Sequence, residues 1–348
     1  MLTAKENMRE CILGGAPDRY VNQYEALKLL FTPSPSPFER PRKGGEPKVN
    51  AWGVTYIYPE TAPAPFPLHT PEKTVVKDIE HWRETVRAPD LKTIPDAQWD
   101  MAKARYDAVD GALAYRAAFV APGLFEQCHN LCGLENALIY FLEYPEKMHE
   151  LIEYLTEYEL QLAELICSRL RPDAVFHHDD WGSETNSFLR PELFAEMFLE
   201  PYKRIYRYYK DHGCEFVFHH SDSYAANLVP YMIEMGIDVW QGCMHSNDVP
   251  ELVKKYGGRI TFMGEIDNKF VDFDGWTPQD CEKAVFDAIG RVGTMKHFIP
   301  CITQGGPGSM YPGAYRCISD GIDSYNVTHL GASQEKLELS RIPQDIMF

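Results

Sequence analysis

Short apolar runs alternate with longer amphipathic stretches from about residue 110 onward. The apolar runs, which predict strands, are residues 116–121, 173–178, 215–220, 237–242, 259–264 and 296–301. Between two of them, residues 145–170 repeat apolar side chains at helical spacing, and Pro145 suits a first helical turn. Alternating strands and helices indicate a parallel sheet. We expect a further strand near residues 19–27, which with the C-terminal segment completes a (β/α)8 TIM-type barrel.

A barrel is the favoured α/β architecture, and an open doubly wound sheet is the alternative. The doubly wound alternative is disfavoured because no GxGxxG follows the first strand and no GxxxxGK[ST] occurs. A chain of 348 residues is longer than most single domains, but barrels often run past two hundred residues as one domain. We therefore expect residues 1–348 to form a single barrel domain.

Residues 31–72 are dense in proline, with aromatic residues between the prolines. Few backbone N–H groups are free for regular structure there, so we expect a long ordered loop. Loops of this length are often lids over a site. We therefore predict that this loop and an amphipathic N-terminal helix form an extension that covers the barrel mouth. A solvated linker is the alternative, although the aromatic residues would be wasteful in one.

The overall charge narrows the classes of partner. Lys plus Arg is 34 against 51 for Asp plus Glu, a formal net charge of −17, and no Lys/Arg cluster is interleaved with aromatics. Nucleic acids and anionic membranes are therefore poor partners.

No apolar run is long enough to cross a bilayer, and the start of the chain lacks a secretory apolar region. Nine scattered cysteines favour reduced thiols, so we expect a cytoplasmic protein.

Polar residues follow the predicted strands at their carboxyl ends. The segments are HHDD (177–180), HHSD (219–222), QGCMH (241–245), GEID (264–267) and PCIT (300–303). Because the carboxyl ends of parallel strands meet at one mouth, where barrel enzymes keep their active sites, we expect these side chains to share a site. A lone aspartate at a strand end is more often a helix cap, so the prediction depends on the coincidence of several ends.

Alternation along a strand selects among adjacent residues. Only one of His219 and His220 can point into the barrel, and we choose His220, because Asp222 two residues on then lies on the same side. Such a pair is either a metal-ligand pair or an acid–base pair, and a hydrogen-bonded histidine with a capping aspartate is the structural alternative. Of Asp179 and Asp180 only one is expected to face the pocket, and we choose Asp180 as an acid. Helix capping or a salt bridge is an equal interpretation.

Other strand ends add candidates for metal binding and for substrate binding. Glu265 is a ligand, an acid–base group or a cap, and Cys301 is either a packed thiol or the sulfur ligand of an N/O/S zinc set. We take Asp180, His220, Asp222 and Glu265 as catalytic candidates, and His220, Asp222, Glu265 and Cys301 as candidate metal ligands. The candidates for substrate binding are Trp52, Trp181, Gln241 and Tyr311. For the aromatic residues, packing in the core is an equally supported interpretation.

Several segments together carry a family resemblance. KENMRECILGGAPDR, HHDDWGSETNSFLRPELFAEMFLEPYKR, FHHSDS, MGIDVWQG, FMGEIDN and IPCITQGGPGSMYP occur in this order. Over essentially its full length the chain resembles the uroporphyrinogen decarboxylase superfamily, in its corrinoid-dependent methyltransferase branch, and in particular the methyltransferase I component of O-demethylase systems. The resemblance implies a distorted (β/α)8 barrel. Decarboxylase members grip their substrate with an Arg-rich N-terminal motif, whereas the corresponding segment here has only Arg19.

Methyltransferase members of the superfamily bind zinc through a His-x-Cys pair and a later Cys. His220 stands at the His and Cys301 at the later Cys, but Asp222 replaces the middle Cys. This departure implies a harder, oxygen-rich centre that suits an ether more than a thiol. The implied reaction is demethylation of a small methoxylated aromatic substrate, with Zn2+ as the metal where one is bound.

The methyl acceptor implied by the resemblance is the Co(I) of cobalamin on a separate corrinoid protein, because no DxHxxG corrinoid-binding motif occurs in this chain. The alternatives are a zinc-thiolate methyltransferase of the methylcobamide:thiol type, a decarboxylase of the uroporphyrinogen decarboxylase type, and a non-catalytic binding protein. The oligomeric state is left open, and a homodimer is one option.

Overall fold

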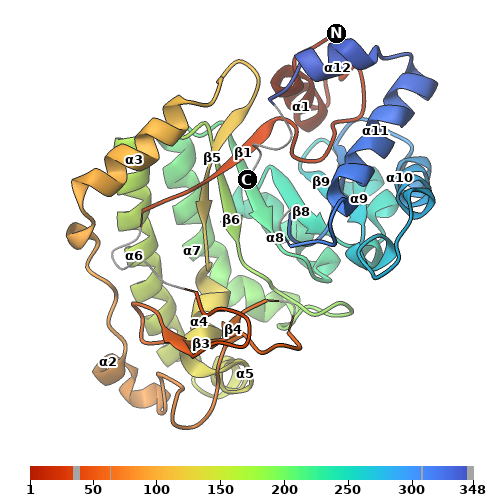
Figure 1. Ribbon diagram of the computed structural model, residues 1–348. Coiled ribbons are helices and arrows are strands. Elements are labelled where there is room, and N and C mark those ends of the chain that lie inside the picture. The colour runs from red at the N-terminus through yellow and green to blue at the C-terminus, as the bar shows by residue number, and fades with distance from the viewer. Residues whose placement is uncertain (34–39, 63, 307–308, 343–348) are drawn as a thin grey trace.

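Seven parallel strands form the central sheet of the computed structural model, which describes residues 1–33, 40–62, 64–306 and 309–342. In spatial order they are β1 (Leu27–Phe31), β5 (Tyr115–Val120), β6 (Ala174–His178), β7 (Phe216–His220), β8 (Val239–Cys243), β9 (Thr261–Ile266) and β10 (Phe298–Ile302). The sheet curls, with helices along its outer side (Figure 1). The TIM-type barrel architecture is confirmed, and all six strands predicted from apolar runs are present.

Helices follow the strands as a barrel requires. The longer ones are α3 (Asp96–Asp107), α6 (Pro145–Leu170), α7 (Pro191–Asp211), α10 (Pro278–Val292) and α11 (Ala314–Leu330). The shorter ones are α1 (Ala4–Leu13), α2 (Trp82–Thr85), α4 (Leu124–Cys132), α5 (Leu134–Glu143), α8 (Val229–Met235), α9 (Val249–Tyr256) and α12 (Gln334–Leu339). Helix α6 has the predicted bounds, with proline in its first turn and a buried apolar stripe.

The sheet has seven strands where we predicted eight. In the described part of the chain, the edge strands β1 and β10 do not pair with each other. The segment near residues 19–27 turns rather than extends, and β1 begins only at Leu27. Gln23 adopts a left-handed backbone conformation, with φ 50°. Its side-chain oxygen accepts from the backbone N–H of Ile302 at 3.3 Å, and its side-chain nitrogen donates to Ser319 Oγ at 2.7 Å. Buried polar side chains here bond to neighbouring elements, so this segment lacks strand pairing.

Residues 31–72 contain more regular structure than the loop we predicted. Three short strands, β2 (Lys48–Val49), β3 (Thr55–Ile57) and β4 (Phe66–Pro67), form an antiparallel sheet. The turn after β2 is held by Asn50, whose side-chain oxygen accepts from the backbone N–H groups of Trp52 and Val54, both at 3.0 Å. Strands this short leave no alternating pattern to detect. Residues 34–39 and 63 of the predicted segment lie outside the described residues.

The two parts of the predicted N-terminal extension lie at opposite ends of the sheet (Figure 1). Helix α1 is at the amino ends of the strands, where Cys11 Sγ donates to the carbonyl of Phe298 and Thr261 Oγ1 donates to that of Ile12. The β2–β4 sheet lies near α4, at the carboxyl ends. Only the second part is therefore at the mouth.

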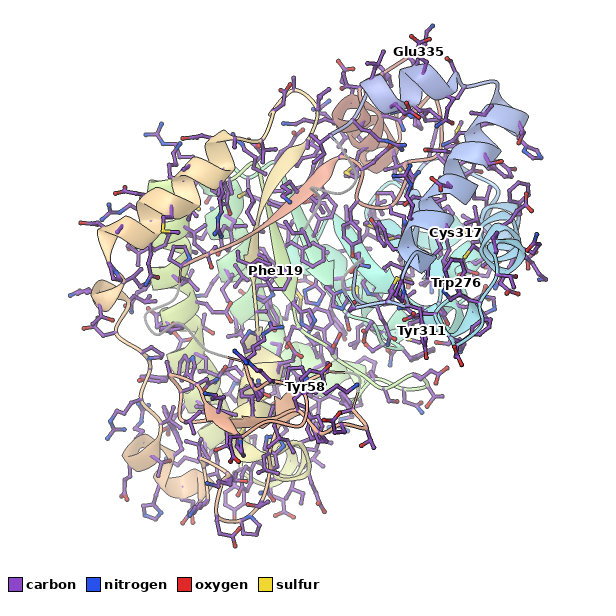
Figure 2. The ribbon with its side chains drawn as sticks, viewed as in Figure 1. Tyr58, Phe119, Trp276, Tyr311, Cys317 and Glu335 are labelled. Carbon is purple, nitrogen blue, oxygen red and sulfur yellow. The ribbon has the colours of Figure 1, made fainter. Side chains whose placement is uncertain are left out.

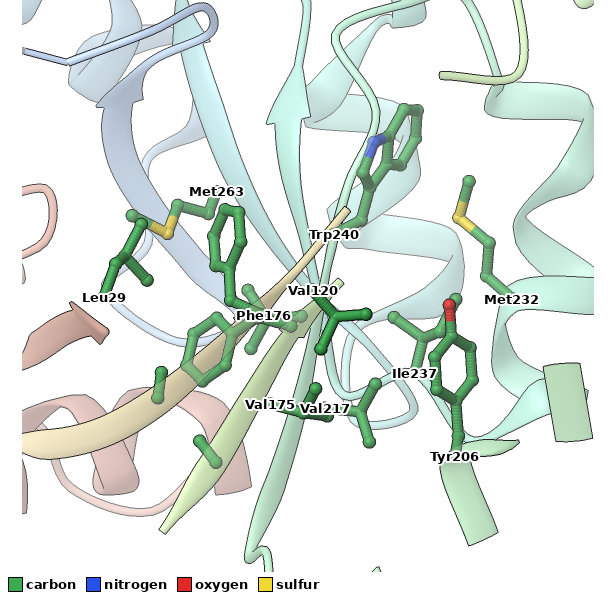
Figure 3. Close-up of a cluster of buried hydrophobic side chains, with 14 of the residues drawn as sticks. Leu29, Val120, Val175, Phe176, Tyr206, Val217, Met232, Ile237, Trp240 and Met263 are labelled. Atoms are coloured by element: carbon green, nitrogen blue, oxygen red, sulfur yellow. The ribbon is translucent and has the colours of Figure 1, made fainter. Parts of the chain in front are cut away.

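Buried side chains fill both faces of the strands. Leu29, Phe176 and Met263 gather on one side, and Val217, Ile237 and Tyr206 on the other (Figure 3). The inner group packs the barrel interior beneath the mouth, as the layered cores of barrels do. None of the described helices has the length and apolarity needed to span a membrane.

Candidate active site at the barrel mouth

Two double-histidine motifs lie on neighbouring strands in matched register. His177 pairs with His219 and His178 with His220. Because side chains alternate, His178 and His220 face the same side, and their rings stack with centroids 4.4 Å apart. His177 and His219 face α7, where the Tyr206 hydroxyl lies 3.2 and 2.9 Å from their Nδ1 atoms. The structure places the predicted His220 at the mouth and adds His178, which we had not singled out.

The adjacent carboxylates Asp179 and Asp180 separate in the same way. Asp179 is buried and accepts from the backbone N–H groups of Phe125 at 3.1 Å and Glu126 at 2.7 Å, in the first turn of α4. It also accepts from the indole of Trp181 and the hydroxyl of Tyr202. Burial, with the charge of Glu126, raises the pKa of Asp179 to about 7. Asp179 therefore caps a helix, and Asp180 is free to face the mouth.

Asp180, His220 and Asp222 meet as the sequence predicts. An oxygen of Asp180 lies 4.0 Å, and one of Asp222 3.8 Å, from His220 Nε2. Asp180 Oδ1 also accepts from the backbone N–H of Asp222 at 2.9 Å. Burial and the charge of Asp180 raise the pKa of Asp222. Two carboxylates and an imidazole thus share a partly buried space.

Glu126, at the start of α4, completes this cluster. His178 Nδ1 lies 3.0 Å from Glu126 Oε2. Burial alone would lower the pKa of His178, but Glu126, together with Asp180 and Asp222, raises it to about 10. The space between these side chains is therefore strongly attractive to positive charge.

Three members of the cluster have the arrangement of metal ligands. His178, Asp180 and His220 each offer one donor atom, and the three atoms lie within 4.8 Å of one another. Two imidazole nitrogens and one carboxylate oxygen form a donor set found in catalytic sites for divalent transition metals. This set shares only His220 with the zinc set predicted from the sequence.

Gln241 and Cys301 lie behind His220. Gln241 Oε1 accepts from His220 Nδ1, and its amide nitrogen donates to the carbonyl of Ile302 at 3.1 Å. The Cys301 thiol is fully buried and hydrogen-bonded with Gln241 and Tyr24, and burial raises its pKa well above the usual range. Gln241, predicted to bind substrate, instead orients His220, and Cys301 lies outside the metal-type cluster.

Glu265 is directed away from the cluster. Its backbone has φ 71°, a left-handed conformation that breaks the side-chain alternation of β9. Its carboxylate contacts Arg291 of α10 at 2.7 Å and His245 Nδ1 at 2.9 Å, and it lines a separate groove of about 630 Å3 along α10. Burial raises the pKa of Glu265, whereas Arg291 opposes that shift. We had found no basic neighbour in the local sequence because Arg291 comes from the following helix.

The three predicted aromatic residues have different surroundings. Trp181 is 1% exposed and stacks on His219 at 3.9 Å, so it belongs to the core. Tyr311 is 44% exposed, its backbone N–H donates to Asp272 at 2.7 Å, and it lies on the α11 side of the molecule, outside the residues that line the mouth cavity (Figure 2). Only Trp52 lines the cavity at the mouth.

This cavity, of about 600 Å3, lies between residues 31–33, 50–56 and 64–67, the end of β5, and helices α4 and α6. Its aromatic walls are Phe31, Trp52, Tyr56, Phe66, Phe119 and Tyr158. Trp52 packs edge-to-face on Tyr158, with ring centroids 4.9 Å apart. Glu126 and His178 line the same cavity, so the aromatic space reaches the histidine cluster.

The fold and the mouth define a barrel protein with a histidine–carboxylate site beside an aromatic cavity. The family model for uroporphyrinogen decarboxylase (URO-D) matches residues 50–309, and the chain belongs to this family, as its motifs predict. Among solved structures it is similar to a methyltransferase from Methanosarcina mazei, with 11% sequence identity and a TM-score of 0.63. That likeness, which concerns the fold, covers 93% of this chain and 99% of the other. A search of curated proteins found no match.

Proposed function

We propose that this protein is a corrinoid-dependent methyltransferase that demethylates a small methoxylated aromatic compound. The methyl group passes to the Co(I) of cobalamin carried by a separate corrinoid protein, which docks at the mouth. The observation that carries the proposal is the aromatic cavity that opens onto the cluster of His178, Asp180 and His220. The methyltransferase with the similar fold adds support at the level of architecture.

The cavity suits a single aromatic ring. Its volume of about 600 Å3 is ordinary for a small-molecule site, and the Trp52–Tyr158 pair offers a ring both an edge and a face. A substrate with many carboxylates fits poorly, because Glu126, Asp180 and Asp222 would repel it. Arg19 does not offset them, because it is 1% exposed and paired with Asp18 at 2.7 Å. Among the described residues that line the cavity, Arg40 is the one arginine or lysine, which is too little positive charge for many carboxylates.

The reaction requires stabilisation of the leaving oxygen. As the Co(I) electron pair attacks the methyl carbon, a carbon–cobalt bond forms, and the carbon–oxygen bonding pair stays on oxygen as a phenolate. Phenolate leaves an ether poorly unless its developing charge is neutralised. A cation held by His178, Asp180 and His220 would supply that neutralisation as a Lewis acid. The chain itself would hold the ring against Trp52 and exclude water with the β2–β4 sheet.

The zinc-thiolate alternative receives less support from the site. Activation of a thiol substrate favours a soft centre with sulfur ligands. The donors gathered at the mouth are nitrogen and oxygen atoms, and Cys301 is turned toward Tyr24 and Gln241. A methyl ether is therefore the better-matched donor.

The proposal is tested by incubating the protein with a reduced corrinoid protein and a panel of methoxyarenes, and following methylcobalamin by absorbance. We expect methyl–cobalt to form with at least one arene, and His220→Ala to slow it at least about 100-fold. A thiol or methylamine donor that outperforms every arene would contradict the proposal. So would a complete lack of methyl–cobalt while the cobalt stays reduced.

A further inference from the structure

The three donor residues at the mouth are each held by a second group. His178 Nδ1 is 3.0 Å from Glu126 Oε2, and His220 Nδ1 contacts Gln241 Oε1. Asp180 Oδ1 accepts from a backbone N–H at 2.9 Å. Such outer partners orient the ligands of metal sites and are part of their construction.

The outer partners also determine which histidine nitrogens face the centre. The Gln241 amide nitrogen donates to the carbonyl of Ile302, so its oxygen faces His220 and must accept a hydrogen bond. His220 Nδ1 therefore carries the hydrogen, and its Nε2 presents a lone pair. The Glu126 carboxylate fixes His178 in the same way. On each ring Nε2 is therefore the nitrogen available to a metal ion, which displaces the Nε2 proton of His178 when it binds.

The charge of the cluster favours a cation. Glu126, Asp180 and Asp222 all border the two imidazoles, and in the described part of the chain these carboxylates form ion pairs only with His178 and His220. No lysine or arginine among the described residues is paired with them. A divalent ion would offset this negative charge, as in metal centres generally.

The zinc ligands predicted from the sequence do not fit this geometry. Cys301 is buried against Tyr24 and Gln241, and Glu265 is held by Arg291 on the other side of β9. Neither belongs to the group of donor atoms that converge. The resemblance places the metal toward β10, whereas the converging donors lie at the ends of β6 and β7.

We infer that the mouth binds one divalent first-row transition-metal ion through His178 Nε2, His220 Nε2 and the Asp180 carboxylate, and that Cys301 is not a ligand. Three protein ligands leave coordination positions open, as in catalytic sites. Because His178 lines the aromatic cavity, an open position faces the substrate space. Only the contact between the ion and a substrate oxygen rests on the proposed function. Binding of the ion itself is measured without methyl transfer.

The test uses the full chain with Co2+ as the probe, in equilibrium dialysis followed by metal analysis. We expect about one Co2+ per chain, without a thiolate-to-cobalt charge-transfer band. His178→Gln and Asp180→Asn should each weaken binding at least about ten-fold, and Gln241→Met should weaken it through the His220 orientation. Cys301→Ser and Glu265→Gln are the matched controls and should bind as the wild type does. Circular dichroism and thermal unfolding check that each variant is folded.

Three results would overturn the inference: no uptake by the wild type, unchanged binding in folded His178→Gln, or a thiolate band that disappears with Cys301→Ser. Failure of the proposed function is recognised separately. Co2+ bound with the expected variant pattern, but no methyl transfer from any arene, would support the centre and contradict the reaction.

Discussion

At the scale of single residues, Asp179 and Asp180 show how adjacent identical side chains acquire different roles. Asp179 is fully buried and accepts from two backbone and two side-chain donors, whereas the Asp180 side chain is 28% exposed and borders the two histidines. The difference follows from alternation at the end of β6. One carboxylate stabilises the fold, and the other serves the site.

Replacement of each aspartate by alanine should separate these roles. Asp179→Ala leaves the α4 N–H groups, Trp181 and Tyr202 without an acceptor, so we expect a loss of about 3 kcal/mol in the free energy of unfolding. Asp180→Ala should cost less than about 1 kcal/mol, because water reaches its partners. Urea unfolding measures both values, and equal losses would contradict the assignment.

A second residue-scale prediction concerns acid stability. Burial, with the nearby His69, lowers the pKa of His129 to about 4. The pKa of this histidine in the unfolded chain is about 6.5, so between pH 6.5 and about pH 4 only the unfolded chain takes up the proton. The free energy of unfolding is therefore highest above pH 6.5 and falls as the pH drops through this range. His129→Gln should remove up to about 3 kcal/mol of this fall.

Denaturant unfolding from pH 7 to pH 4 measures the effect. His149→Gln is the matched control, because the His149 side chain is 44% exposed on α6, and it should leave the slope unchanged. An unaltered pH slope in His129→Gln would show that His129 titrates normally in the folded protein.

At the scale of elements, the β2–β4 segment forms one wall of the cavity and positions Trp52. If that indole contacts the substrate ring, Trp52→Ala should raise KM about ten-fold or more, with a smaller change in kcat, because it removes binding common to ground and transition states. Trp276→Ala, which removes an indole outside the residues lining the cavity, is the control. Steady-state kinetics would refute this role if both variants behaved alike.

Sequence periodicity predicted the parallel strands well and the site in part. Apolar runs located six strands, and alternation correctly sent His220 and Asp180 to the mouth. The same alternation, applied to HHDD in register with HHSD, would have found His178. Alternation failed at Glu265, where a left-handed φ of 71° redirects the side chain and is not visible in local sequence. The cavity walls depend on contacts between distant segments, which no local pattern contains.

At the scale of the whole molecule, the fold brings together a strongly negative cluster and an apolar aromatic cavity in a chain of net charge −17. A polyanionic substrate is disfavoured by both the local and the overall charge. A neutral methoxyarene would pack mainly against the aromatic walls, in a cavity that Arg40 and Glu159 also line. This combination is the basis of our proposal that the chain acts as a methyltransferase rather than as a decarboxylase.

The central claim is that the methyl group moves intact from oxygen to cobalt. The most direct measurement is a single turnover with a methoxyarene carrying a 13C-labelled methyl group and an excess of Co(I) corrinoid protein, followed by NMR. We predict equal amounts of 13C-methylcobalamin and free phenol. Label found in formaldehyde, formate or carbon dioxide, or phenol released without labelled methylcobalamin, would contradict the account.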